Sequence, residues 1–170
     1  MNTPQPLAAD LLFPALAKEL ENDPQLAGTL RGLFIVRVLQ KGRYVRTWYI
    51  LFHQDGQATP IVSRSRPTWP ILPKGEELPT VMLQVEDKDL VNMATGGRSC
   101  LAVYMDGRLH VSGDLYLAIR FAKVLVDAGG VDKTLQLLRQ HRVDPFPASS
   151  TKPVTPPDAV SLYRFVTSKL

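Results

Sequence analysis

The chain has 170 residues, 45% of them hydrophobic, and a formal net charge of +4, which predicts a single globular domain able to build a hydrophobic core. Its one cysteine, Cys100, excludes an intramolecular disulfide and a metal site made of several cysteines. The sequence has no run of 18 apolar residues, so no transmembrane helix is predicted, and the first ten residues lack the pattern of a secretory signal.

The positive charge is concentrated in residues 31–74, which hold eight lysines and arginines and one acid, Asp55. A basic surface of this kind attracts anionic lipid headgroups or phosphate backbones, but solvated outer faces of strands explain the same pattern. Nucleic-acid binding needs aromatic residues interleaved with basic ones on a strand face, or a helix-turn-helix. Neither pattern is visible, so we expect no nucleic-acid partner.

Apolar spacing predicts the elements, and glycine, proline and aspartate mark their ends. Asp23 precedes a first-turn proline, residues 41–42 have the Lys-Gly pattern of a turn between two strands, and Asp87 and Asp114 precede helical patterns as N-caps. In chain order we expect a helix over residues 11–21, a short helix over 24–30, strands over 33–40, 44–53, 58–63 and 81–85, a helix over 88–94, a short helix over 99–105, a strand over 109–112, and helices over 114–127 and 132–141.

This order of elements predicts an α+β domain with a five-stranded, mostly antiparallel sheet covered by helices. Four prolines exclude residues 64–80 from a sheet interior and predict a long loop. Further prolines, with serines and threonines, predict a linker over 144–157. We therefore expect a domain over 1–143, the linker over 144–157, and a tail over 158–170 that begins with a short apolar helix.

The helix expected over 114–127 is apolar almost all round, because only a narrow stripe with Arg120, Lys123 and Asp127 is polar. A helix packed on one sheet needs an apolar arc of only about 100°. Another helix, a protein partner or a lipid-filled cavity must therefore cover the rest. The strand segment 48–52 is likewise apolar on both faces.

Patterns of catalysis are not visible. The three histidines, His53, His110 and His141, lack metal-ligand spacing, and no glycine-rich phosphate loop follows a strand. Arg98 would lower the pKa of Cys100, yet a lone cysteine is more often a small core residue. The sequence therefore favours binding over catalysis, and we expect no metal and no cofactor. A small hydrolase is the least favoured of the functions considered.

Three acids, Glu86, Asp87 and Asp89, are crowded at the start of the helix expected over 88–94. Carboxylates at this position satisfy free backbone N–H groups and interact favourably with the helix dipole. We interpret all three as residues that serve the start of this helix.

Four sequence blocks resemble the sterol carrier protein-2 family in the right order, across residues 11–127. They are Gly-Leu-Phe-Ile at 32–35, Thr-Trp-Tyr-Ile at 47–50, an acidic helix start at 85–90 leading to Ala-Thr-Gly at 94–96, and Gly-Arg-Leu-His-Val-Ser-Gly-Asp at 107–114 before Leu-Tyr-Leu-Ala-Ile. The chain departs from the family in its longer loop at 64–80, in an alanine at 122 where members often have glutamine, and in the extension after 131.

The resemblance implies a five-stranded sheet with helices on one face, enclosing an apolar tunnel. It also implies non-enzymatic binding and transfer of fatty acids, fatty acyl-CoA, sterols or phospholipids. Methionines suit such a lining because the thioether chain is flexible. The side chains expected to line the tunnel are Phe34, Trp48, Met82, Met93, Leu101, Met105, Leu115, Ile119 and Leu125.

The last three residues, Ser168, Lys169 and Leu170, have the pattern of a peroxisomal address. We expect localisation in the peroxisome and capture of this tripeptide by a helical-repeat groove of an import receptor. A lipid ligand and a transient contact with an anionic membrane are the other expected partners. The alternative is a peroxisomal interaction module with a filled core that docks a lipid-metabolising enzyme.

Overall fold

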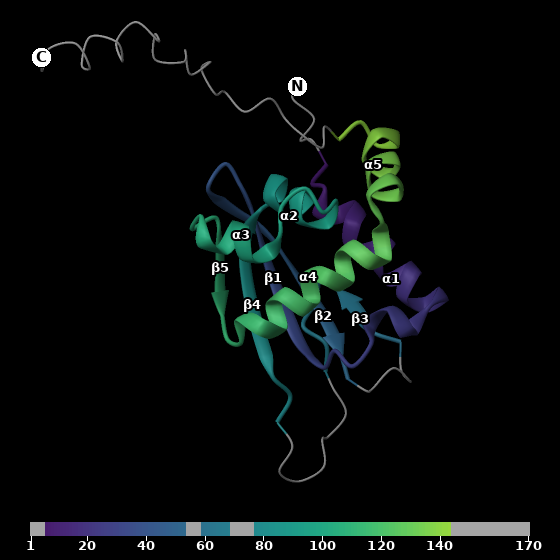
Figure 1. The fold of residues 1–170 in the computed structure, drawn as a ribbon, viewed down its shortest axis with the longest axis vertical. Helices are drawn as coiled ribbons and strands as arrows, with labels where there is room; N and C mark the ends of the chain where they lie inside the picture. The colour runs from purple at the N-terminus through teal and green to yellow at the C-terminus, as the bar shows by residue number, and fades with distance from the viewer. Residues whose placement is uncertain (1–5, 54–58, 69–76, 144–170) are drawn as a thin grey trace, which may run out of the picture.

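The computed structural model describes residues 6–53, 59–68 and 77–143 (Figure 1). All the elements expected within these residues are present, and the linker at 144–157 and the tail at 158–170 lie outside them. Within this part of the chain no helix is long and apolar enough to cross a membrane. The elements are α1 (Ala9–Asn22), the 3-10 helix η1 (Pro24–Ala27), β1 (Gly32–Gln40), β2 (Arg43–Phe52), β3 (Ile61–Ser63), β4 (Thr80–Glu86), α2 (Asp87–Ala94), α3 (Cys100–Met105), β5 (Leu109–Ser112), α4 (Leu115–Gly129) and α5 (Val131–Gln140).

The five strands form one sheet in the order β3-β2-β1-β4-β5. The pairs β1–β2, β2–β3 and β4–β5 are antiparallel, and the central pair β1–β4 is parallel. Lys41 and Gly42, with φ of 53° and 75°, connect β1 to β2 in the left-handed backbone conformation that tight hairpin turns use. The predicted α+β class and mostly antiparallel sheet are confirmed.

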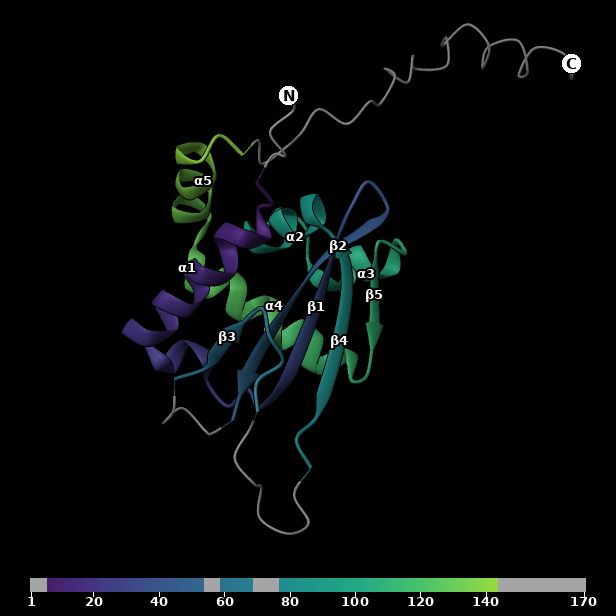
Figure 2. The ribbon, with the colours of Figure 1, turned by 180° about the vertical axis from the view of Figure 1, so that it is seen from behind.

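Helices α2, α3 and α4 lie on one face of the sheet (Figure 1), and from behind the strands stand in front of α4 (Figure 2). An aromatic cluster fills the centre of this layer. The ring of Phe34 on β1 stacks on Phe121 of α4 with 4.7 Å between centroids, and Phe52 of β2 meets Phe34 edge-on at 5.7 Å. All three side chains are fully buried, so the middle of the domain is closely packed.

Other helices of the same chain supply the extra cover that α4 requires. Helix α4 lies next to α1, α2, α3 and α5 as well as the sheet. The polar stripe faces outward: Lys123 pairs with Asp127, and Arg120 donates to the Thr29 hydroxyl at 2.7 Å. The sequence left open whether another helix, a protein partner or a lipid-filled cavity covers this helix. Among the described residues, neighbouring helices provide the cover.

Glu86, the last residue of β4, holds the β1–β2 turn. Its two carboxylate oxygens accept hydrogen bonds from the backbone N–H groups of Lys41 and Gly42, at 3.0 Å and 2.6 Å. The acid is 44 and 45 residues away from these groups in the sequence. Its side chain makes no capping bond to α2.

Asp87 caps α1 instead of its own helix. The backbone N–H groups of Ala8 and Ala9 donate to its two oxygens at 2.8 Å and 2.9 Å. Burial raises the pKa of this carboxyl above its ordinary value of 3.8, although the two backbone bonds act in the opposite direction. The interpretation of Asp87 as the cap of α2 is therefore wrong, because its oxygens are taken by a helix 78 residues away.

The third acid, Asp89, pairs with Arg108 at the start of β5. Arg108 Nε donates to one oxygen at 3.1 Å, and Nη2 lies 2.5 Å from the other. Only 1% of the Asp89 side chain is exposed, so the guanidinium compensates a buried charge. All three acids thus join segments that are distant in sequence.

Replacing Asp87 by alanine removes both bonds to the first turn of α1. Lost N-caps cost about 1–2 kcal/mol, which corresponds to a fall of about 3–8 °C in melting temperature for a domain of this size. The matched control is Asp127→Ala, which removes an exposed carboxylate from an ion pair on α4 and should change stability by less than about 0.5 kcal/mol. Equal melting temperatures for the two variants would show that Asp87 does not anchor α1.

Candidate functional site

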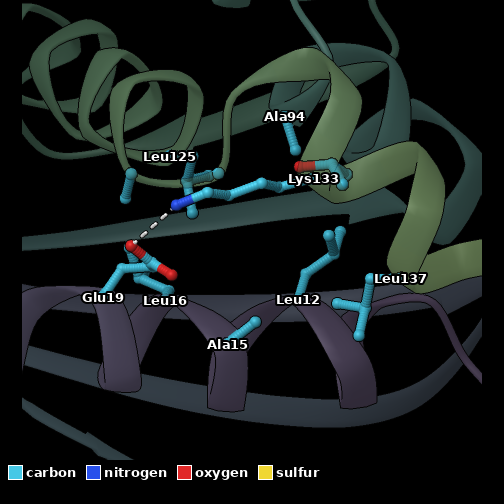
Figure 3. A pocket seen from close by; sticks show the side chains of 11 residues that line it. Leu12, Ala15, Leu16, Glu19, Ala94, Leu125, Lys133 and Leu137 are labelled. Atoms are coloured by element: carbon cyan, nitrogen blue, oxygen red, sulfur yellow. Dashed lines mark hydrogen bonds and ion pairs between the residues drawn. The ribbon is translucent and has the colours of Figure 1, made fainter.

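A cavity of about 60 Å³ lies where α1, α4 and α5 meet, next to the end of α2 (Figure 3). Its wall is mostly aliphatic, and its charged groups are one acid from α1 and one lysine from α5. The lining residues are Leu12, Ala15, Leu16 and Glu19 of α1, Ala94 of α2, Leu125, Ala128 and Gly129 of α4, and Lys133, Thr134 and Leu137 of α5.

Helical periodicity places these side chains on the cavity. The four residues of α1 follow one another at intervals of three, one and three positions, so they share one face of the helix. On α5, Lys133, Thr134 and Leu137 repeat the same spacing. In Figure 3, Leu12 and Leu16 point from α1 toward Leu125 and Lys133 on the opposite side.

The junction of α4 and α5 is tight on the cavity side. A methyl group added to Gly129 would lie 2.5 Å from the Thr134 hydroxyl oxygen, closer than real side chains approach. The next residue, Gly130, ends α4 and begins α5 with φ of 60° and ψ of 156°, a conformation that glycine adopts readily. The glycine pair therefore lets α5 turn back over the cavity.

The acid and the lysine form an ion pair. Lys133 Nζ lies 3.4 Å from a Glu19 carboxylate oxygen, and Figure 3 shows this contact bridging α1 and α5. The Lys133 side chain is 70% exposed and that of Glu19 31%. The pair thus marks the polar edge of an otherwise apolar cavity.

The structure spreads the nine side chains expected to line a tunnel over several places. Leu125 lines the cavity. Phe34 belongs to the aromatic cluster, Trp48 packs on Phe13 with centroids 5.4 Å apart, and Met93 is buried in α2. The other members are half-buried or exposed, and contact of any of the nine with a lipid stays a prediction. The half-buried members are Met82, Leu115 and Ile119.

Leu101 and Met105 lie outside the cavity, on the exposed side of α3. They are 47% and 74% exposed, because this six-residue helix turns Cys100 and Val103 toward the core. The residues of α1 and α5 that line the cavity were also not among those predicted from the sequence. For α1 a signal was present, since Leu12, Ala15 and Leu16 form its apolar stripe.

The described residues offer little for catalysis. Burial raises the pKa of the Cys100 thiol to about 11, so it is protonated at neutral pH despite the nearby Arg98. His110 is exposed on β5. Within residues 6–53, 59–68 and 77–143, no three histidine, cysteine or acidic side chains are grouped so that they could hold a metal ion.

Comparison with known proteins shows which family and which solved structures this chain is similar to. The model of the SCP-2 sterol transfer family matches residues 13–126. A comparison with curated proteins gave no match. Among solved structures, sterol carrier protein 2 from Yarrowia lipolytica in its apo form is similar with a TM-score of 0.55 and 15% identity, over 76% of this chain and 97% of that one.

Two insect structures have the same fold. The sterol carrier protein domain 2 of Helicoverpa armigera has a TM-score of 0.52 and 20% identity, over 76% of this chain and 94% of that one. Sterol carrier protein-2 like-3 from Aedes aegypti has a TM-score of 0.52 and 18% identity, over 72% and 99%. The family match covers most of the described domain, from the first turns of α1 to the last turn of α4. The chain belongs to the SCP-2 sterol transfer family.

Proposed function

We propose that this protein binds and transfers lipids without chemical conversion, and that the cavity between α1, α4 and α5 receives the hydrocarbon part. The observation that carries this proposal is an aliphatic cavity at a helix seam in a domain of a sterol transfer family. Fatty acids, fatty acyl-CoA, sterols and phospholipids are the ligand classes considered. Each methylene that leaves water contributes about 0.8 kcal/mol, so apolar burial alone gives substantial affinity.

The ligand must enlarge the cavity, since about 60 Å³ is less than half of the roughly 150 Å³ that a benzene-binding cavity offers. Two sides of the cavity resist change, because α4 is packed on the aromatic cluster and α1 is bonded to Asp87. The third side, α5, follows a glycine and has only Thr134 and Leu138 fully buried. Displacement of α5 is therefore the least costly route to a larger cavity.

The filled centre of the domain favours a second candidate function. The stacked rings of Phe34 and Phe121 occupy the space between the sheet and α4, which is what an interaction module without a ligand would have. Such a module would dock a lipid-metabolising enzyme. Organic extraction and mass spectrometry of natively purified protein separate the two functions, because only a carrier retains stoichiometric lipid.

We further propose a transient contact with anionic membranes through the outer side of α3. Leu101, Tyr104 and Met105 are exposed at helical spacing on this side. Figures 1 and 2 show the β1–β2 turn, which carries the exposed Lys41 and Arg43, at the same end of the sheet as α3. Apolar and aromatic side chains at the same end of the domain as exposed cations suit the interface of an anionic bilayer.

The proposed location is the peroxisome. Its support is the tripeptide Ser168, Lys169 and Leu170, which lies outside the described residues. The proposed partner is the helical-repeat groove of an import receptor, which would hold the tripeptide and its carboxylate.

Filling the cavity should abolish lipid retention. Ala15 lies on the cavity and is half-buried, so Ala15→Phe places an aromatic ring in the ligand space, and this ring, like a ligand, must displace α5 to fit. The control is Ala17→Phe, at an equally half-buried position of the same helix that does not line the cavity. We expect lipid recovered by extraction to fall about tenfold in the first variant only. Equal retention in both variants would exclude this cavity as the lipid site.

The membrane contact should depend on the exposed side of α3. We expect the double variant Leu101→Glu and Met105→Glu to reduce binding to phosphatidylserine vesicles by about fivefold or more, since it places charge on the apolar side. Ile61→Glu is the control, because Ile61 is exposed on β3 at the opposite edge of the sheet. Co-sedimentation measures both, and an equal loss in the control would refute a specific role of α3.

The address can be tested by deletion. Removal of Ser168 to Leu170 should leave the melting temperature unchanged and move a fluorescently tagged protein from peroxisomes to the cytosol, because an import receptor reads the terminal tripeptide. The tag is placed at the N-terminus so that the carboxylate stays free. Continued import of the truncated protein in cells without the full-length chain would contradict the proposal.

A further inference from the structure

The cavity carries its two charged side chains on one side, where Lys133 is exposed and Glu19 is half-buried, and we call this side the mouth. Glu19 comes from α1, whose first turn is bonded to Asp87, and Lys133 comes from α5, whose displacement would open the cavity. The other nine lining residues carry no charge. A hydrocarbon chain in the cavity would therefore leave its headgroup beside these two side chains.

The contact between Glu19 and Lys133 is easily exchanged. The separation of 3.4 Å is at the long end for a hydrogen bond, and exposed ion pairs contribute only about 0–1 kcal/mol. Lysine has three donors on a flexible stem, and Glu19 is the only partner that the described residues give to Lys133. The ammonium group can thus accept another anion without losing a strong bond.

The two side chains differ in how well they can follow a headgroup. Lys133 is 70% exposed and long, so its charge can move with a ligand at the mouth. Glu19 is shorter, 31% exposed and fixed over the cavity on α1, so it stays close to any bound group. An anionic headgroup is attracted by the mobile cation, whereas a cation would have to approach the less accessible acid. The net charge of +4 adds to this preference.

We infer that Lys133 receives the anionic headgroup of a single-chain amphiphile, such as a fatty carboxylate, and that Glu19 holds Lys133 over the cavity when no ligand is bound. This inference rests on the proposed lipid-binding function and names its ligand class. Glu19 then has a second effect, because its charge repels the bound headgroup and limits the affinity. Removal of the Lys133 side chain should weaken the preference for an anionic headgroup, and removal of the Glu19 side chain should strengthen it.

The experiment compares two ligands that differ only in charge. Dodecanoate and dodecanol, below their micellar concentrations at pH 7.5, compete with the neutral dye Nile red for the full-length protein. The wild-type protein should bind dodecanoate about three- to fivefold more tightly than dodecanol, as expected for one partly exposed ion pair. The preference should shrink as salt is added.

Four variants assign the preference to the pair. Lys133→Gln should lose it by weakening dodecanoate binding about three- to fivefold, Lys133→Arg should keep it, and Glu19→Gln should increase it by a similar factor. Dodecanol affinity should stay within about twofold throughout, which shows that the apolar wall is intact. The control is Lys123→Gln, which breaks the Lys123–Asp127 ion pair on α4, outside the cavity lining.

The outcomes separate the two claims. If both ligands bind but their ratio is the same in wild type and Lys133→Gln, the headgroup inference is wrong and the carrier function stands. A preference of the wild-type protein for dodecylamine over dodecanoate also overturns the inference. If neither dodecanoate nor dodecanol displaces the dye from the wild-type protein, the inference and the proposed function both fail.

Discussion

The position of α1 depends on a carboxylate that belongs to another helix. Asp87 accepts the free N–H groups of Ala8 and Ala9, so the first turn of α1 is bonded to the junction of β4 and α2. Beside it, Asp10 of α1 pairs with Arg46 of β2, which adds a second link to the sheet. One wall of the cavity is therefore fixed to the sheet by polar bonds at the N-terminal end of the helix. The same junction orders the β1–β2 turn through Glu86.

The cavity is a consequence of how much apolar surface α4 carries. A helix that is apolar on most sides must be surrounded, and here the sheet and four helices surround it. Close packing is complete at the sheet, where Phe34 and Phe52 meet Phe121. Cylindrical helices leave a gap where three of them meet, and the small side chains Ala94, Ala128 and Gly129 keep this gap open. The seam of α1, α4 and α5 is such a meeting point.

Local sequence signals were enough to predict the helices and strands. They could not predict which residues distant in the sequence would become partners. Lys41-Gly42 and Asp114 act as the sequence predicts, because a turn and an N-cap involve neighbours in the chain. An acid at a helix start gives the same local pattern whether it caps its own helix or a distant one, so the role of Asp87 could not be read from the sequence. Family resemblance gave the fold, whereas the exposure of Leu101 and Met105 depends on which side of the short helix α3 faces the core.

The packing of α5 explains why we propose it as the adaptable wall of the cavity. Gly130 has open space around the position of a missing Cβ, so glycine is needed there for backbone conformation and not for close packing. Beyond this residue α5 is held by buried Leu138 and Thr134 and by an ion pair at the surface. The sheet side of the domain has no comparable freedom, since its core is closely packed and Asp87, Glu86 and Asp89 link its segments. An enlargement of the cavity by displacement of α5 would therefore move Lys133, so the charge at the edge of the cavity would move together with this wall.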